Sequence, residues 1–525
     1  MSEGGNNGRQ SAAPLLEREL LLLCCYDSDS LSEDGLRELI QRHGLTPNNH
    51  VSDYKFFLAA CCNERVTEGI IRLLLEYFPD AASTADEDGR SPLHRACFNP
   101  NVTPNIAQIL LDTAPQSVRS VTNNGAMPLH YLCSNRKLDV VSAMKMLNLL
   151  LEKYPEAVRH ADNKGFLPIH IAACKRSPDF CRLLIEAYPG SERMTNFGGA
   201  LHLHQACAKN SLATVEYLYR QYPDSINHTT TNGIYPIHAV ISGIQLRDNP
   251  STAVDIVQFL LDCDSNQKLL QYQGWSLLRF ACRQQYNDSN IKAGIQIVKI
   301  IFDAHPASIE DDNIATNIHR YHQQVQEFLN EELAYARQAN DHRLMMTPDD
   351  NGRLPLHVAL QNNVRLGSIK LLVKGNPSAI RSIEDNGALP LHVACEHHDS
   401  VSIVGYVLGL ARITRDATDS QGNTALHYAC RASKYETIAL ILEKYDAVSV
   451  SKRNLQNKLP IELLWESNAV EDRDRVEYME SFFRLLKAYP ETLTIACMEL
   501  QSTSSASAAS QNQSGNGKKR KFGDE

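Results

Sequence analysis

Residues 86–97 read DEDGRSPLHRAC, and a close copy, EDNGALPLHVAC, occupies residues 384–395. The final phrase of this stretch, built around a histidine, recurs at gaps of mostly 34 to 36 residues. Eight copies keep the histidine: His94, His130, His170, His204, His238, His357, His392 and His427. A fixed period of about 20 to 50 residues is typical of stacked repeats, so the sequence predicts a repeat array.

Each repeat can be divided into a turn and two helices. A glycine precedes the phrase, as in DEDGR or TTNGI, and Asp-Gly and Asn-Gly pairs supply the positive φ of a tight hairpin. Proline then opens an inner helix, where its missing N–H costs nothing. A small pair such as Ala96 and Cys97 follows, which lets neighbouring helices approach closely.

An outer helix carries the apolar run of each repeat, for example IIRLLLEYFP at residues 70–79. Leucine and isoleucine spaced by three and four residues give this helix one apolar face. We expect the helix to end at a proline, which cannot continue it. The prolines in this position are Pro79, Pro115, Pro155, Pro189, Pro223, Pro306, Pro377 and Pro490.

The phrase, the period and the turn residues together resemble the ankyrin repeat family, although many ankyrin repeats end the outer helix with glycine. Degenerate copies place Leu58, Arg279 and Glu462 in the histidine position, so about eleven units run from about residue 51 to about residue 495. The resemblance implies an all-α solenoid with projecting hairpin fingers. It also implies that the chain is a non-enzymatic scaffold or adaptor, which binds other proteins in the groove of inner helices and fingers.

Histidine and cysteine one helical turn apart share a face, so a metal site was the first alternative. The pairs recur along a line and do not converge, which disfavours a metal. The ankyrin resemblance implies instead that the eight histidines make structural hydrogen bonds to the backbone. We expect the repeat cysteines to be small buried apolar residues.

The sequence nominates no catalytic, cofactor-binding or metal-binding residue. It has no Walker phosphate loop, HExxH or GxSxG motif, and fragments such as DEDG lack the twelfth-position glutamate of a calcium loop. An enzyme would need an unrecognised site in the 307–348 region or in the long loops. We expect no cofactor.

Candidate partner-binding residues lie at the finger tips and just after the small pair of each inner helix. They are Phe98, Asn99, Ser134, Asn135, Lys209, Arg283, Gln361, Asn362, Glu396, His397 and Arg431. The fingers carry acidic residues such as Asp86, Asp162 and Asp349, which favours a partner with a basic or polar surface.

These patterns divide the chain into six segments. We expect a disordered N-terminus at 1–14, a helical cap at 15–50, a first ankyrin stack at 51–309, and a helical insert or degenerate repeat at 310–348. A second stack follows at 349–497, and a disordered Ser-rich tail at 498–525. Within the insert, apolar residues from Asn317 onward predict one long amphipathic helix. This helix either packs as a degenerate repeat or forms a short coiled-coil or partner-docking segment.

Charge and cysteine content indicate the cellular compartment and the class of partner. The net charge of -9 gives no global attraction to nucleic acid or anionic membranes, and no apolar segment predicts membrane insertion. Fourteen cysteines without a CxxC pair fit a reducing cytoplasmic or nuclear setting, and we expect a monomer. The tail carries Lys518, Lys519, Arg520 and Lys521, a candidate nuclear import signal. A nuclear regulator of transcription is therefore the alternative function.

Overall fold

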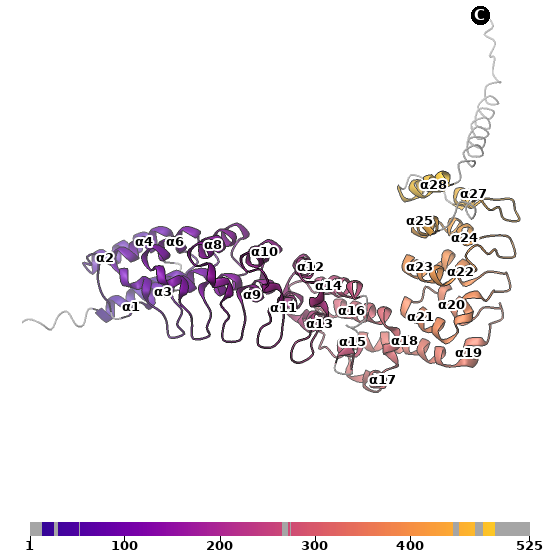
Figure 1. Cartoon of the computed structure of the whole chain (residues 1–525), viewed down its shortest axis with the longest axis horizontal. Helices are drawn as coiled ribbons and strands as arrows, with labels where there is room; N and C mark the ends of the chain where they lie inside the picture. Colours follow the sequence, from indigo (N-terminus) through magenta and orange to yellow (C-terminus); the bar gives the residue numbers. More distant parts are fainter. Residues whose placement is uncertain are drawn as a thin grey trace, which may run out of the picture. The chain divides into compact units, whose positions relative to one another are not determined.

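The computed structural model describes residues 13–488 except 26–29, 52, 265–270, 273–274, 445–450 and 468–475. The chain forms two compact units. The first comprises Met1–Ile301 with Arg320–Val325, and the second comprises Phe302–His319 with Gln326–Glu525. Both are built from pairs of helices joined by turns that project from one side (Figure 1).

In the first unit, an N-terminal helix pair is followed by repeats of an inner and an outer helix. The pair is α1 (Ala13–Cys24) and α2 (Glu33–Arg42), which pack on α3 and α4. The inner helices are α3 (Lys55–Cys62), α5 (Pro92–Phe98), α7 (Pro128–Ser134), α9 (Pro168–Lys175), α11 (His202–Lys209), α13 (Pro236–Ser242) and α15 (Leu277–Cys282). The outer helices are α4 (Glu68–Tyr77), α6 (Pro104–Thr113), α8 (Val140–Lys153), α10 (Pro178–Ala187), α12 (Leu212–Gln221), α14 (Ser251–Cys263) and α16 (Ile291–Ala304).

The second unit continues the same pattern. Its inner helices are α20 (Pro355–Gln361), α22 (Pro390–His397), α24 (Ala425–Arg431) and α27 (Pro460–Ser467). Its outer helices are α21 (Leu366–Gly375), α23 (Val401–Leu410), α25 (Tyr435–Lys444) and α28 (Val476–Ala488). The architecture is the predicted all-α solenoid, to which the structure adds one short antiparallel pair of strands, β1 (Gln271–Tyr272) and β2 (Trp275–Ser276).

The region between the regular repeats contains a short 3-10 helix, η9 (Ile318–Arg320), and three α-helices, where the sequence predicted a single long helix. The α-helices are α17 (Asp312–Asn317), α18 (Gln323–Asn340) and α19 (His342–Met346). The predicted helix begins six residues later than expected, at Gln323, and the His322 ring accepts the Gln324 N–H (3.3 Å) in its first turn. Phe328, Leu329 and Leu333 of α18 are buried.

Most of the prolines predicted to end the outer helices also begin a short 3-10 helix. Helix α4 ends at Tyr77, and Pro79 is the first residue of η1 (Pro79–Ser83). The residue before proline avoids the α region, and Phe78 accordingly has φ -135° and ψ 66°. Pro115, Pro155, Pro223, Pro306 and Pro377 occupy the same position; Pro189 precedes its 3-10 helix by two residues, and Pro490 lies outside the described residues.

The inner helices supply fully buried residues to the core. Leu93, Ala96 and Cys97 of α5 are fully buried, and α5 packs on α3 and α7. The small Ala96 and Cys97 side chains permit this close approach on both sides. None of the described helices combines the length and apolar composition needed to cross a membrane.

Candidate binding groove

The repeat histidines join each inner helix to the next finger. The Nδ1 atom of His94 accepts the Ser91 N–H (3.1 Å), and Nε2 donates to the Ala126 carbonyl of the following finger (3.0 Å). The same two bonds are made by His130, His170, His204, His357, His392 and His427. The eighth, His238, is fully buried against the Phe280 ring, with ring centroids 4.8 Å apart.

These contacts leave no ring nitrogen for a metal ion in the seven hydrogen-bonded histidines. Burial lowers the pKa of His94, His130 and His170 to about 4, so their rings are neutral at pH 7. Burial also raises the pKa of the thiols that follow, to about 12 for Cys133 and Cys207. In the described part of the chain, no three His, Cys, Asp or Glu side chains are placed to hold a metal.

In the fingers that begin with aspartate, the side chain of that residue accepts backbone N–H groups of its own turn. Asp86 Oδ1 accepts the Asp88 N–H (3.0 Å) and the Arg90 N–H (2.8 Å). Asp162 and Asp349 accept the equivalent pairs of backbone N–H groups in their own fingers. Asp86 also forms ion pairs with Arg90 and Arg95. These aspartates therefore hold the fingers in shape and offer a partner less free charge than the sequence suggested.

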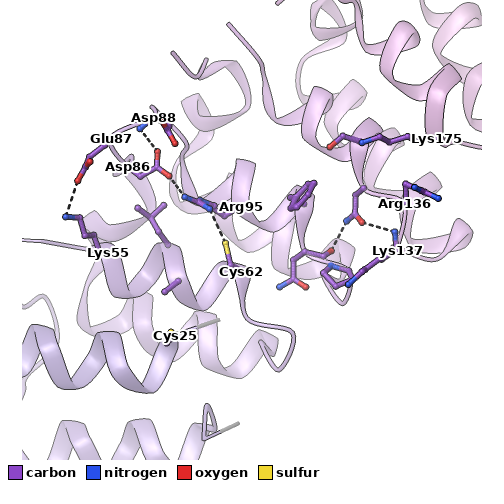
Figure 2. Close-up of a pocket in the computed structure, with 17 residues that line it drawn as sticks. Cys25, Lys55, Cys62, Asp86, Glu87, Asp88, Arg95, Arg136, Lys137 and Lys175 are labelled. Atoms are coloured by element: carbon purple, nitrogen blue, oxygen red, sulfur yellow. Dashed lines mark hydrogen bonds and ion pairs between the residues drawn. The ribbon is translucent and has the colours of Figure 1, made fainter. Parts of the chain in front are cut away.

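A cavity of about 810 Å³ lies in the first unit between the fingers and the inner helices. Figure 2 shows charged residues at its two ends: Asp86, Glu87 and Asp88 from a finger at one end, and Arg136, Lys137 and Lys175 at the other. Apolar atoms dominate the lining between them, with contributions from Leu58, Ala59, Cys62 and Phe98. Phe98 is 56% exposed at the end of α5 and packs edge-on against Tyr131 (6.3 Å between ring centroids).

The predicted partner-binding residues fall into three groups. Phe98 and Ser134 line the first cavity, while Lys209 and Arg283 are exposed elsewhere on the first unit. In the second unit, Gln361, Glu396 and His397 line a cavity of about 370 Å³, and Asn362 and Arg431 are exposed outside its lining.

Asn99 and Asn135 form the third group, and here the structure corrects the prediction. They are only 2% and 3% exposed. Asn99 Nδ2 donates to the carbonyls of Cys61 (3.0 Å) and Asn63 (2.8 Å) in the preceding repeat. Asn135 makes the equivalent bonds one repeat later. Both amides link repeats and are not free for a partner, although they touch the cavity wall.

Comparison with known proteins identifies ankyrin repeats in two stretches of the chain. The family model described as ankyrin repeats (3 copies) matches residues 100–196 and 356–454. The chain contains ankyrin repeats. Among curated proteins, none matches the sequence significantly. One similar solved structure is titled "Bd0816 Predatory Endopeptidase from Bdellovibrio bacteriovorus in complex with immunity protein Bd3460". It is 16% identical, covers 36% of this chain and 92% of its own, and has a TM-score of 0.30.

The basic residues that line this cavity were not predicted from the sequence. Arg95, Arg136 and Lys175 line the cavity, yet none was a predicted binding residue. Lys175 is the last residue of α9, and Arg136 follows α7 by two residues. Basic residues at several inner-helix ends, such as SNRK at 134–137 and ACK at 173–175, were the available signal.

Proposed function

We propose that this ankyrin chain is a non-enzymatic scaffold or adaptor, and that the cavity of its first unit binds a partner protein. The observation that supports this proposal is the exposed aromatic side chain of Phe98, which lies in the wall of a cavity of about 810 Å³ between a finger and the inner helices. Aromatic side chains that fill such surfaces dominate many protein interfaces, because they bury a large area at little entropic cost.

Affinity capture from cell extract tests the proposal. The bait is the full chain, either unchanged or carrying Phe98→Ala, and partners are quantified by mass spectrometry. The matched control is Phe483→Ala, since Phe483 of α28 is 60% exposed and belongs to the second unit. We expect partners to be lost with Phe98→Ala and kept with Phe483→Ala. An identical partner set for all three baits would contradict the proposal.

A second candidate is a nuclear regulator of transcription, which the sequence cluster Lys518, Lys519, Arg520 and Lys521 supports. These residues lie outside the described part of the chain. A fluorescent fusion in which all four become alanine tests nuclear entry. An unchanged distribution would exclude import through this cluster.

A further inference from the structure

Positive charges line up at the ends of successive inner helices in the first unit. Arg136 and Lys137 follow α7, Lys175 ends α9, and Lys209 ends α11. Because α7 packs on α9 and α9 on α11, these side chains fall in neighbouring repeats. We call Arg136, Lys137, Lys175 and Lys209 the cationic row.

The cationic row has little opposing negative charge. Among the described residues, neither Lys175 nor Lys209 forms an ion pair. Arg136 pairs with Asp248 (2.8 Å) and Lys137 with Glu64 (4.0 Å), but these four side chains are 46–88% exposed, so both pairs contribute little. Partial burial and repulsion from Lys209 and Arg136 lower the pKa of Lys175, although Cys174 opposes this. An incoming anion would relieve that repulsion.

At the other end of the cavity, each finger carboxylate has a basic partner of its own. Asp86 pairs with Arg95, Asp88 with Arg90 (2.8 Å), and Glu87 with Lys55 (3.5 Å). In total, five cationic and three acidic side chains line the cavity. The groove therefore presents positive charge at Arg136, Lys137 and Lys175, in the same cavity as the apolar wall that contains Phe98, and Lys209 extends the row into the next repeat.

These features favour a protein segment over a nucleic acid. A polyanion with charge along its whole length would also meet the finger carboxylates, of which Glu87 is 91% exposed. The apolar wall at Leu58 and Phe98 instead fits an aliphatic or aromatic side chain. Neighbouring helix axes lie about 8–10 Å apart, and an extended chain rises about 3.3–3.6 Å per residue, so about nine residues would span α5 to α11.

We infer that the first unit binds an extended protein segment in which acidic residues accompany a large apolar side chain. The acidic residues contact the cationic row, and the apolar side chain packs against Phe98. This inference rests on the proposed function and adds the class of partner to it.

A structural role for the lysines gives a different expectation. Basic residues in the last turn of a helix interact favourably with its dipole, so Lys175 and Lys209 would then matter for stability. Under our inference, Lys175→Ala/Lys209→Ala leaves the melting temperature nearly unchanged and weakens binding. Lys145→Ala/Lys153→Ala is the matched control, since it removes the same charge from outer helix α8.

The test is fluorescence anisotropy with the full chain and labelled peptides of about twelve residues, long enough to span the row. One peptide carries Glu and Asp around a central Leu, and the other carries Gln in place of the acids. A single-stranded oligonucleotide of equal charge is the third probe. We expect the acidic peptide to bind best and to weaken with salt. We expect Lys175→Ala/Lys209→Ala to reduce its affinity about tenfold, and Lys145→Ala/Lys153→Ala to leave it unchanged.

Three results would overturn the inference: equal binding of the Gln peptide, equal or tighter binding of the oligonucleotide, or no effect of Lys175→Ala/Lys209→Ala. The capture experiment separates this failure from failure of the proposed function. If capture of a partner depends on Phe98 but not on Lys175 and Lys209, the inference of an acidic partner is wrong and the proposed scaffold function stands. If no captured partner depends on Phe98, the proposed binding site in the first unit is wrong.

Discussion

At the scale of single residues, the buried histidines do two tasks at once. Nδ1 of His170 accepts the Leu167 N–H (3.1 Å) at the start of its own helix, and Nε2 donates to the Met194 carbonyl (3.1 Å) in the next repeat. The sequence predicted the positions of these histidines, and the ankyrin resemblance implied backbone bonds. The acceptor lies 24 residues away, in the next repeat, so local pattern could not identify it.

Replacing His170 with alanine should destabilise the first unit by about 2–4 kcal/mol, because two buried hydrogen bonds and the packing of a ring are lost together. His397→Ala is the control, since His397 is exposed. Urea denaturation followed by circular dichroism measures both. Equal midpoints for the two variants would refute the joining role of His170.

Acid should destabilise the array through these same histidines. The folded pKa of His94, His170 and His204 is about 4, below the ordinary value of 6.5, so between these values the unfolded chain binds more protons. The contribution of these histidines to the free energy of unfolding is therefore fully present above pH 6.5. It falls as the pH drops toward 4, by up to about 1.4 kcal/mol per pH unit for each histidine. Urea midpoints at pH 7, 6 and 5 test the slope, which His170→Asn should reduce. Stability that rises on acidification would contradict this.

The orientation of the Asn99 and Asn135 side chains could not be predicted from the sequence. Each follows the small pair of an inner helix, a position that usually faces the groove, and the sequence therefore placed both on the binding surface. In the structure each amide reaches back across the repeat boundary to two carbonyls. Whether an amide faces solvent or the previous repeat depends on contacts that one repeat alone does not specify.

At the scale of elements, the fingers form a continuous backbone ladder. The N–H of Asn123 donates to the Asp88 carbonyl (2.8 Å), and the N–H of Asn163 to the Asn124 carbonyl (3.0 Å). Fingers of the second unit repeat the contact, as from Ser420 to the Asn386 carbonyl (3.0 Å). The sequence predicted each hairpin from its glycine. It did not predict the ladder, because backbone groups carry no residue-specific signal.

Gly165→Ala should therefore be costly. Gly165 has φ 79°, and an added Cβ would lie 2.7 Å from the Phe197 backbone nitrogen in the next finger. We expect a loss of about 1–3 kcal/mol from the strained backbone and the displaced finger. Gly409→Ala in α23 is the control: its Cβ meets nothing within 4 Å, so the helix should gain up to about 1 kcal/mol. If thermal denaturation shows the same change in melting temperature for both variants, the contacts between fingers do not stabilise the array.

The 3-10 helices add a second contact between repeats. Arg159 of η3 (Pro155–Arg159) lies over the Tyr188 ring at 4.8 Å, and Arg119 lies over Tyr154 at 4.7 Å. A double-mutant cycle with Arg159→Ala and Tyr188→Leu should give a coupling energy of about 0.5–1 kcal/mol, as expected for a partly exposed cation–π pair. A coupling energy of zero would show that the stacking contributes nothing.

At the scale of the whole molecule, the repeat period predicted the all-α ankyrin solenoid and located the interruption in its pattern. The segment boundaries proposed from sequence, including the cap at 15–50 and the insert at 310–348, remain predictions. For the binding site, the sequence nominated Phe98 and, of the cationic row, only Lys209. Lys175 and Lys209 are 34 residues apart, and only the stacking of helices α9 and α11 makes them neighbours.

If the first unit recognises a partner through the charge of its groove, reversing that charge should reverse its preference between acidic and basic segments. Lys175→Glu/Lys209→Glu and the unchanged chain are each titrated with the acidic peptide and with a copy in which Lys replaces every Glu and Asp. We expect the unchanged chain to prefer the acidic peptide and Lys175→Glu/Lys209→Glu to prefer the basic one. The same preference in both proteins would contradict it.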